Sequence, residues 1–539
     1  MTTPTSRADV RARRGLVTAP HAHASHAGVD ILRGGGNALD AAVAAAATIA
    51  VVYPHMNSIG GDSVWLLWDA ERRRLRGLNA AGRAAAAATR QAYASRFGAT
   101  IPVRGGPAAL TVPGAVSGWW EVHAYSRDVM GSPVKWPTLL DRAVHHAREG
   151  FAPSPGQRRV TAATRDLFTG AAGADVRRTL WPIYHPGRLV GDRFVQADLA
   201  STLTRLAQDG PDAFYQGALT GRIVDGAARA GSPLARGDFA AHRAEWTEPL
   251  RVRYRAGEAV SLPPPTQGVA ALAILSLVEG FDVAALDDGD HVHVVVEATK
   301  LAFEDRDRYL ADPDFVDVPV ARCLDPERLD RRRQLIDWGR ARLVDGDPAV
   351  GGDTIAIVAA DGAGNVVVVI QSIYHEFGSG IVAGDTGVLL QNRGAFFSLD
   401  PRHPNCLAPG KRTAHTLVPS MYLQDGRPRL AYGTMGGEGQ PQTQAALLTR
   451  VVDRGMTPQA AVEAPRWLLG RTWGDPSRAL RIEDRFGPVV AEDLRRRGHE
   501  VNVVDGWSDL MGHAQLIRVD ADGLVGGSDP RADGGALGC

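Results

Sequence analysis

The sequence predicts a mixed fold of helices and strands, α/β in the broad sense and α+β in detail. Three features favour it. Residues 115–310 carry mostly helical patterns. Two apolar runs, 354–360 and 366–372, flank an Asp-Gly-Ala-Gly-Asn turn, which predicts a β-hairpin close to the core of a sheet. Hydrophobic residues make up 44% of the 539 residues, enough for a large packed core.

The N-terminal region predicts a short alternation of elements. Residues 1–14 are polar and basic, and we expect them to be disordered. A strand begins near Leu16, and a helix follows over residues 22–33 until the glycines at 34–36 end it. Asn37 is a suitable cap for the next helix.

That next helix carries the longest apolar run of the chain, the 12 residues from Ala41 to Val52. A bilayer requires about 20 such residues, so the run predicts a buried helix. Residues 64–68 and 74–78 then predict two strands around a charged turn.

The middle of the chain contains two breaks in the helical pattern. Pro263-Pro264-Pro265 predicts a rigid interruption. Residues 322–352 are rich in Arg, Asp and Gly and include Arg331-Arg332-Arg333, which predicts a solvated segment. Gly352-Asp353-Thr354 therefore predicts a charged linker that enters a buried strand directly.

Composition excludes several functions. Lys+Arg and Asp+Glu are both 60, so the formal net charge is zero and gives no reason to expect nucleic acid or a membrane as partner. The three cysteines have no metal-ligand spacing and argue against a disulfide framework. No apolar stretch follows the basic N-terminal residues, so we expect no signal peptide and a cytoplasmic protein.

Thr354 is the candidate nucleophile. A hydroxyl needs a base to remove its proton, and a threonine at a chain terminus can use its own α-amine, whose reference pKa is about 8. That amine exists only after the Asp353–Thr354 bond is cut. A threonine that begins a central strand after a polar linker suits such a reaction, although most Gly-Asp-Thr sequences are ordinary strand starts.

Several long motifs in a fixed order resemble the γ-glutamyltranspeptidase family of N-terminal-nucleophile hydrolases, from about Gly15 to the end of the chain. The motifs are Ala19-Pro-His with Gly35-Gly-Asn-Ala-Leu-Asp-Ala-Ala42, Ile59-Gly-Gly-Asp62, Pro263-Pro-Pro with Gly268, Glu297-Ala with Lys300-Leu-Ala-Phe303, and Thr354 with Asp361-Gly-Ala-Gly-Asn365 and Phe377-Gly-Ser-Gly-Ile-Val-Ala-Gly384.

The resemblance implies a four-layer αββα sandwich that cleaves itself into residues 1–353 and 354–539, which remain together as one catalytic domain. It implies catalytic roles for Thr354 as nucleophile, Ser372 as supporting hydroxyl, and Gly436-Gly437 as oxyanion hole. It places the arginine that binds the substrate carboxylate at Arg83. We expect no cofactor and no metal ion.

The chain departs from γ-glutamyl enzymes where they bind the substrate's amino group. Their acidic residue is replaced by Phe396, their asparagine by Tyr374, and their tandem serines by His415-Thr416. An α-ammonium without its acidic partner would be costly to bury. This pattern predicts a small amide that carries a carboxylate but no amino group, and it looks like the oxamate amidohydrolase branch. Arg393 is either a second cationic contact or an arginine paired with a nearby Asp.

Two other functions stay open from the sequence. One keeps the chemistry and changes the substrate, as in a γ-glutamyl transferase or a glutaryl-type acylase. The other is a binding protein on an inactive scaffold. We expect small-molecule amides and the chain's own two fragments as partners, while assembly of processed heterodimers into a homo-oligomer stays open. His291 and His293 would share one face of a strand, as metal ligands can, but the resemblance places them on a helix, where they diverge, which disfavours a metal site.

Overall fold

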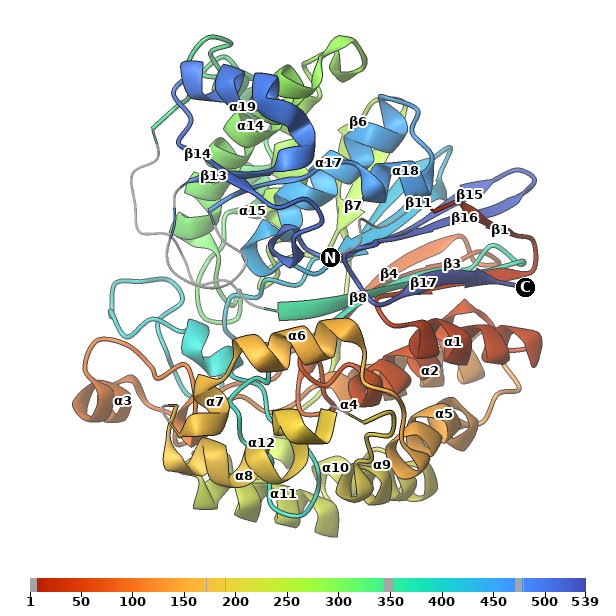
Figure 1. The fold of residues 1–539 in the computed structure, drawn as a ribbon, viewed down its shortest axis with the longest axis vertical. Helices are drawn as coiled ribbons and strands as arrows, with labels where there is room; N and C mark the ends of the chain where they lie inside the picture. The colour runs from red at the N-terminus through yellow and green to blue at the C-terminus, as the bar shows by residue number, and fades with distance from the viewer. Residues whose placement is uncertain (1–6, 171, 190, 344–352, 471–476, 478) are drawn as a thin grey trace.

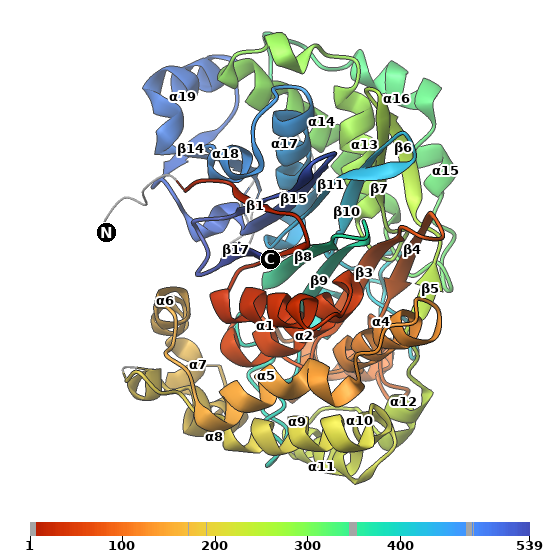
Figure 2. The ribbon, with the colours of Figure 1, turned by 90° about the vertical axis from the view of Figure 1, so that its right-hand side faces the viewer.

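Two antiparallel sheets packed face to face form the centre of the molecule, with helices on both outer faces (Figures 1 and 2). The computed structural model describes residues 7–170, 172–189, 191–343, 353–470, 477 and 479–539. Within these residues each of the two sheets has seven strands. The predicted αββα sandwich is therefore confirmed.

The first sheet, which we call the nucleophile sheet, has the order β17-β2-β8-β9-β3-β4-β5. The predicted hairpin forms two of its central strands, and the predicted strand pair near residue 70 lies beside it. Its strands in chain order are β2 (Gly15–Ala19), β3 (Asp62–Asp69), β4 (Arg74–Asn79), β5 (Glu245–Thr247), β8 (Asp353–Asp361), β9 (Val366–Tyr374) and β17 (Gly535–Gly538).

The second sheet, which we call the cover sheet, has the order β1-β16-β15-β11-β10-β7-β6. Its strands are β1 (Val10–Ala12), β6 (Leu250–Tyr254), β7 (Gly257–Ser261), β10 (Ser420–Gln424), β11 (Arg427–Thr434), β15 (Ala514–Asp520) and β16 (Gly523–Ser528). A separate small sheet contains β12 (Trp467–Leu469), β13 (Leu480–Glu483) and β14 (Val501–Val504).

Alternation along the central strands divides the core into layers. The even-numbered Ala356, Val358 and Val368 pack between the two sheets with Met421 and Ile517 of the cover sheet. The odd-numbered residues of β8 and β9 pack against helices on the other face. Because successive side chains of a strand point to opposite faces, residue parity fixes which layer each one reaches.

Helices α1 (Ala22–Arg33) and α2 (Ala38–Val52) lie directly against the nucleophile sheet, beneath β8, β9 and β3 in Figure 2. Asn37 caps α2: its side chain accepts from the N–H groups of Leu39 and Asp40, while Asp40 accepts from the N–H of Asn37. The whole of α2 is buried, as its apolar run predicts. Further helices on this side are α3 (Arg90–Phe97), α4 (Ala115–Asp128), α5 (Trp136–Glu149), α6 (Pro155–Ala163), α7 (Asp166–Thr169), α8 (Ala174–Tyr184), α9 (Ala197–Asp209), α10 (Asp212–Tyr215), α11 (Ala218–Arg229) and α12 (Arg236–Ala241).

On the other outer face, apolar side chains of the cover sheet pack against α13 (Gly268–Val278), α14 (Asp288–Tyr309) and α17 (Gln440–Val452). The remaining α-helices are α15 (Val320–Cys323), α16 (Pro326–Arg333), α18 (Pro458–Glu463) and α19 (Gly487–Arg496). Short 3-10 turns are η1 (Gly106–Ala108), η2 (Pro186–Leu189), η3 (Val283–Ala285), η4 (Arg393–Phe396), η5 (Gly437–Gly439), η6 (Asp484–Phe486) and η7 (Asp509–Met511).

Two expectations need correction, and a third needs detail. Residues 115–310 are mostly helical as expected, but residues 245–261 contain β5, β6 and β7. Residues 10–12 pair with β16 as strand β1, so this part of the N-terminal segment is ordered in the sheet. The arginine run is only partly solvated: Arg331 is exposed, but Arg332 and Arg333 lie mostly buried and donate to helix carbonyls of Leu301, Leu277 and Ser276.

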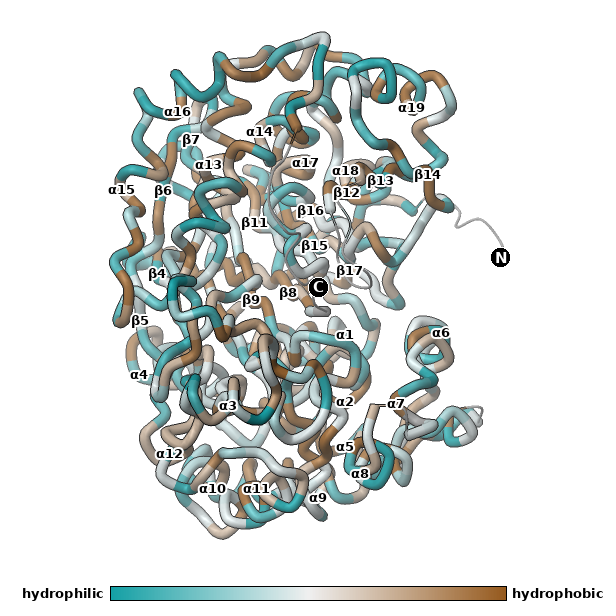
Figure 3. The backbone as a smooth tube through the Cα atoms, turned by 90° about the vertical axis from the view of Figure 1, so that its left-hand side faces the viewer, coloured by the Kyte–Doolittle hydropathy of each residue, from teal (hydrophilic) through white to brown (hydrophobic). Residues whose placement is uncertain are grey.

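Hydropathy follows the same layers. In Figure 3 the hydrophobic colour gathers around β8 and β9, whereas the outer helices α16 and α19 are largely hydrophilic. None of the described helices combines the length and the apolar character that a membrane crossing requires.

Candidate active site

Three neighbouring strands present polar side chains on one face at one end of the nucleophile sheet. These are Thr354 of β8, Ser372 of β9 and Asp62 of β3, and all three are buried. Each has the parity of the residues that face the cover sheet. Thr354 Oγ1 lies 3.4 Å from Ser372 Oγ, and Asp62 is the strand partner of Ser372. The structure thus brings the predicted nucleophile and its supporting hydroxyl together.

A β-bulge sets the geometry beside Thr354. The strand register shifts between Asp353 and Ile355, so two residues of β9, Ser372 and Ile373, oppose Thr354 alone. Ser372 Oγ accepts from the N–H of Tyr374 at 2.8 Å, and Tyr374 has a φ of +80°. A bulge re-aims side chains, and this one lies beside Thr354 and Ser372, two residues before β9 ends at Tyr374.

The predicted oxyanion glycines follow the end of β11. Gly433 has no side chain, so β11 packs closely against Ala356 of β8 and Ile370 of β9, and the chain reaches Gly436 three residues later. Gly436 and Gly437 have φ values of +136° and +51°, which residues other than glycine rarely adopt. Neither N–H donates to any residue that the structure describes, so both remain available to an oxyanion.

Gln267, which precedes α13, connects this glycine loop to the segment with His415 and Thr416. Its Nε2 donates to the carbonyl of Gly437 at 2.9 Å and to that of Thr416 at 2.8 Å. Its backbone N–H donates to the carbonyl of His415 at 3.0 Å. Since both loops are fixed to one buried side chain, their relative positions are fixed as well.

Arg393 is a fully buried cation whose hydrogen bonds are incomplete. Its Nη1 donates to Thr416 Oγ1 at 3.2 Å, and its guanidinium lies 4.1 Å above the ring of Tyr374. Nε and Nη2 have no hydrogen-bond partner in the described part of the chain. Burial lowers the pKa of Arg393 to about 10, against the influence of Tyr374 and Asp62, so the group stays charged at neutral pH.

Those two nitrogens form one edge of the guanidinium, the edge that meets a carboxylate with two parallel hydrogen bonds. A buried cation with unsatisfied donors is costly, and a bound anion would recover that cost. The alternative of an Arg393–Asp ion pair is not formed among the described residues, where Nη1 donates to Thr416 and the other two nitrogens have no hydrogen-bond partner.

Aromatic rings enclose this position. The rings of Tyr374 and Phe396 lie 5.7 Å apart in an edge-on arrangement. Phe396 also packs against an apolar cluster that includes Val269 and Ala414. Tyr374 and Phe396, which the resemblance places where γ-glutamyl enzymes carry polar groups, thus contact each other beside Arg393, as the predicted short pocket requires.

His415 faces the same end of the nucleophile sheet through Asp62. Its Nε2 lies 3.2 Å from Asp62 Oδ2, while its Nδ1 has no partner within the described residues. Asp62 Oδ1 accepts from Gly82 N, Gly114 N and Gln391 Nε2 at 2.9, 3.2 and 3.0 Å. Burial and Arg393 lower the pKa of His415 to about 4, opposed by Asp62.

Arg83 is engaged in an ion-pair network. Its Nη2 contacts Asp314 at 2.6 Å and Glu245 at 3.2 Å, and its Nη1 lies 3.6 Å from Asp312. Arg412 shares Glu245 and Asp314. The side chain of Arg83 is about one third exposed. The structure therefore occupies Arg83 with protein carboxylates, and its predicted role in substrate binding stays a prediction.

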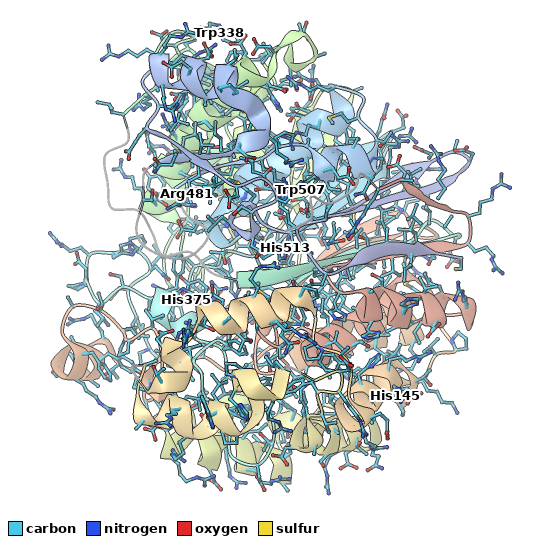
Figure 4. All side chains as sticks on the ribbon, viewed as in Figure 1. His145, Trp338, His375, Arg481, Trp507 and His513 are labelled. Carbon is cyan, nitrogen blue, oxygen red and sulfur yellow. The ribbon has the colours of Figure 1, made fainter. Side chains whose placement is uncertain are left out.

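The cleavage site lies at the edge of the described chain. Asp353 pairs with Tyr374 through its backbone, while residues 344–352 of the predicted linker are outside the described residues. Figure 4 shows His375 and His513 near the beginning of β8. The carbonyl of His513 accepts from Met435 N at 3.1 Å, and His375 N donates to Asn392 Oδ1 at 3.0 Å. Both residues therefore position backbone around the site.

Three polar residues of the site were not predicted individually. Asp62 was noticed only as part of a glycine motif, and Gln267 and Gln391 were not singled out. A buried Asp after two glycines at the start of an apolar strand is a usable signal for Asp62, because such a carboxylate needs several donors. Gln267 follows the triple proline, and nothing in its spacing indicates a contact with Gly437.

One group with metal-ligand atoms lies elsewhere, in the helical layer on the outer face of the cover sheet. The ligand atoms of His293, Glu297 and His499 are within 4.8 Å of one another. His293 Nδ1 is 2.8 Å from His499 Nε2, and the ammonium of Lys300 contacts Glu297 Oε1 at 2.7 Å. These atoms already bind each other and a cation. His291 contacts Thr449 instead, as expected for residues that diverge on a helix.

Comparison with known proteins gives a consistent result along the chain. The sequence model of the gamma-glutamyltranspeptidase family matches residues 24–539. An oxamate amidohydrolase proenzyme of Klebsiella pneumoniae is 45% identical over 526 residues, covering 97% of this chain and 98% of that protein. A glutathione hydrolase-like YwrD proenzyme of Bacillus subtilis is 44% identical over 530 residues, with the same coverage.

A comparison with solved structures shows the same overall fold. The cephalosporin acylase of Bacillus halodurans superposes with a TM-score of 0.92 at 35% sequence identity, covering all of this chain and 98% of the acylase. A similarity of this extent includes both sheets and both helical layers.

Proposed function

This chain belongs to the gamma-glutamyltranspeptidase family of N-terminal-nucleophile enzymes, and we propose that it cuts itself before Thr354 and then hydrolyses a small carboxylate-bearing amide such as oxamate. Its relatives from Klebsiella and Bacillus are named proenzymes, which supports self-processing. The products of oxamate hydrolysis would be oxalate and ammonia. The mature enzyme would consist of residues 1–353 and 354–539.

The residues supply each step of this reaction. In the precursor, the Thr354 hydroxyl attacks the carbonyl carbon of Asp353, and the peptide C–N bond breaks as the ester forms, which frees the α-amine. Hydrolysis of that ester then releases the Asp353 carboxyl group and restores the Thr354 hydroxyl. In the mature enzyme that amine takes the Thr354 hydroxyl proton as the oxygen attacks the substrate amide, and it returns the proton to the departing ammonia. Water then hydrolyses the acyl-enzyme. Ser372 stays within 3.4 Å of the attacking oxygen.

Stabilisation of the tetrahedral intermediate falls to the glycine loop. The N–H groups of Gly436 and Gly437 are unsatisfied among the described residues, and the Gln267 contact keeps the loop in place. Removing one such donor typically costs about 3–4 kcal/mol of transition-state stabilisation.

The unsatisfied edge of Arg393 is the observation that carries the choice of substrate. It offers two donors for a carboxylate, in a buried site enclosed by Tyr374 and Phe396. A γ-glutamyl substrate also brings an α-ammonium, and the position that would pair with it is Phe396. The described residues around Arg393 therefore favour an acid amide without an amino group.

Two assays test the proposal. Purified protein should give two bands on a denaturing gel, and N-terminal sequencing of the smaller one should begin Thr-Ile-Ala-Ile. It should release ammonia from oxamate much faster than p-nitroaniline from γ-glutamyl-p-nitroanilide. Strong turnover of the glutamyl compound alone would refute the substrate assignment.

Thr354→Ala and Thr354→Ser are the matched variants for self-cleavage. Thr354→Ala removes the attacking oxygen, so the chain should remain a single band over days. Thr354→Ser keeps a hydroxyl and should still cleave. If Thr354→Ala is cut at the same place and rate as the unaltered chain, a contaminating protease does the cutting and the proposal fails.

A further inference from the structure

The neighbourhood of Arg393 contains a second unsatisfied polar atom, Nδ1 of His415. An ionised carboxylate only accepts hydrogen bonds, so the 3.2 Å contact with Asp62 Oδ2 requires the proton of a neutral His415 to lie on Nε2. Nδ1 then carries a lone pair. It is buried and has no partner among the described residues.

Asp62 itself is firmly held, which makes it suited to fixing that tautomer. Its other oxygen accepts from two backbone N–H groups, of Gly82 and Gly114, and from Gln391 Nε2. His415 is anchored through its own backbone, since its N–H donates to the carbonyl of Pro265 at 2.7 Å and its carbonyl accepts from Gln267. Asp62 cannot turn away without breaking several hydrogen bonds, and the backbone hydrogen bonds of His415 fix the point from which its ring extends.

The Asp62–His415 pair lies beside the proposed reacting group, the hydroxyl of Thr354. Asp62 is the strand partner of Ser372, whose hydroxyl is 3.4 Å from the Thr354 oxygen. Thr416, next to His415 in the chain, accepts from Arg393. The site therefore combines a donor edge, Nε and Nη2 of Arg393, with an acceptor, Nδ1 of His415.

We propose that His415 accepts a hydrogen bond from the substrate's amide N–H, that Asp62 is the positioning residue that keeps His415 in this tautomer, and that the pair distinguishes the amide substrate from its carboxylate product. This inference rests on the proposed hydrolysis of a carboxylate-bearing amide. Oxamate offers a carboxylate to Arg393 and an N–H to His415. Oxalate offers only acceptors, so one of its oxygens would face the lone pair of Nδ1 and the product would bind weakly.

The decisive variant is Asp62→Asn. An asparagine amide would keep the Oδ1 acceptor for Gly82, Gly114 and Gln391 but place an N–H donor opposite Nε2 of His415. The imidazole would then carry its proton on Nδ1, the change of tautomer known from serine proteases whose triad aspartate is replaced. The site would now offer a donor where the amide needs an acceptor.

The measurements are KM and kcat for oxamate, from ammonia release, and the inhibition constant of oxalate, all at neutral pH on protein shown by gel to be cleaved. Asp62→Asn should raise KM for oxamate about tenfold and lower the inhibition constant of oxalate about tenfold, the size of one lost and one gained hydrogen bond. His415→Gln, which can still reach Asp62 but lacks the imidazole acceptor, should raise KM and change the inhibition constant of oxalate less than Asp62→Asn does, because it adds no fixed donor for oxalate.

Asp69→Asn is the matched control, because Asp69 is a buried aspartate at the other end of β3 that contacts Tyr125 and Arg72. It should leave the ratio of KM for oxamate to the inhibition constant of oxalate unchanged. Unaltered enzyme that hydrolyses oxamate but is inhibited by oxalate as tightly as it binds oxamate would overturn the inference while the proposed function stands. So would an Asp62→Asn enzyme with an unchanged ratio. Unaltered, cleaved enzyme without oxamate turnover would instead refute the proposed function, and the inference with it.

Discussion

At the scale of single residues, Arg83 and Arg393 are both candidates for binding the substrate carboxylate. The family resemblance assigns the substrate carboxylate to Arg83, but in the structure three protein carboxylates surround that guanidinium. Arg393 is buried, charged and has two unsatisfied nitrogens within the described chain. Because an engaged arginine must release its partners before it can bind an anion, we propose Arg393 rather than Arg83 as the receptor of the substrate carboxylate.

Replacing each arginine decides between them. Arg393→Met removes a charge-assisted pair of hydrogen bonds worth about 3 kcal/mol, so KM for oxamate should rise roughly 100-fold. Arg393→Lys keeps the charge without the planar fork and should recover only part of the loss. Arg83→Met should lower the melting temperature and change KM little. If steady-state kinetics show a larger rise in KM for Arg83→Met than for Arg393→Met, Arg83 binds the substrate carboxylate.

Residues that the sequence assigns to one site lie together in the structure, while their roles stay predictions. Thr354 and Ser372 were predicted as a pair and lie 3.4 Å apart, and the aromatic replacements Tyr374 and Phe396 contact each other. The Asp62–His415 pair was not predicted, since 353 positions separate the two residues and only the folded sheet brings them together.

At the scale of elements, the central strands leave no space for extra atoms near the nucleophile. Gly60 and Gly61 precede β3, and a Cβ on Gly61 would lie 2.2 Å from the carbonyl oxygen of Ser372. Glycine is needed there because the backbone of one strand approaches the next, and backbone atoms cannot give way as a flexible side chain can.

Gly61→Ala should therefore push β3 away from β9, lower the melting temperature by several degrees and slow self-cleavage. Gly237→Ala is the control, since nothing lies within 4 Å of its Cβ and its φ is unremarkable. That variant should keep the melting temperature of the parent or raise it slightly, because alanine favours helix more than glycine does. Thermal unfolding of the two precursors checks the prediction, and equal melting temperatures would contradict it.

Element prediction was accurate where patterns were long. The α1 helix and the capped, alanine-rich α2 lie where expected, as does the β8–β9 hairpin. Strands β5, β6 and β7 were missed because they are three to five residues long and interrupt a helical region. The arginines at 332 and 333 were expected in solvent, but carbonyl groups exposed at the end of one helix and along another attract them inward.

At the scale of the molecule, the two expected fragments are interleaved. In the nucleophile sheet, β8 and β9 of the smaller fragment lie between β2 and β3 of the larger one. In the cover sheet, β1, β6 and β7 of the larger fragment flank four strands of the smaller one. Separating the fragments would break strand pairs in both sheets and expose all three main apolar clusters.

The cleaved protein should consequently elute from a sizing column at the position of the uncleaved Thr354→Ala precursor, with both fragments in the same peak. Denaturant should be required to separate them, and the two fragments should unfold in one cooperative transition. Elution of either fragment alone under native conditions would show that the sheets do not hold the halves together.

The first strand of the smaller fragment occupies the interior of a sheet, and its first residues are enclosed on every side. Under the proposed self-cleavage, the amine of Thr354 would form only in a molecule whose sheets have already closed around β8, because Thr354 and Ile355 are buried there. Chemical competence is then a late event in the life of each polypeptide, and unfinished or misfolded copies stay inert.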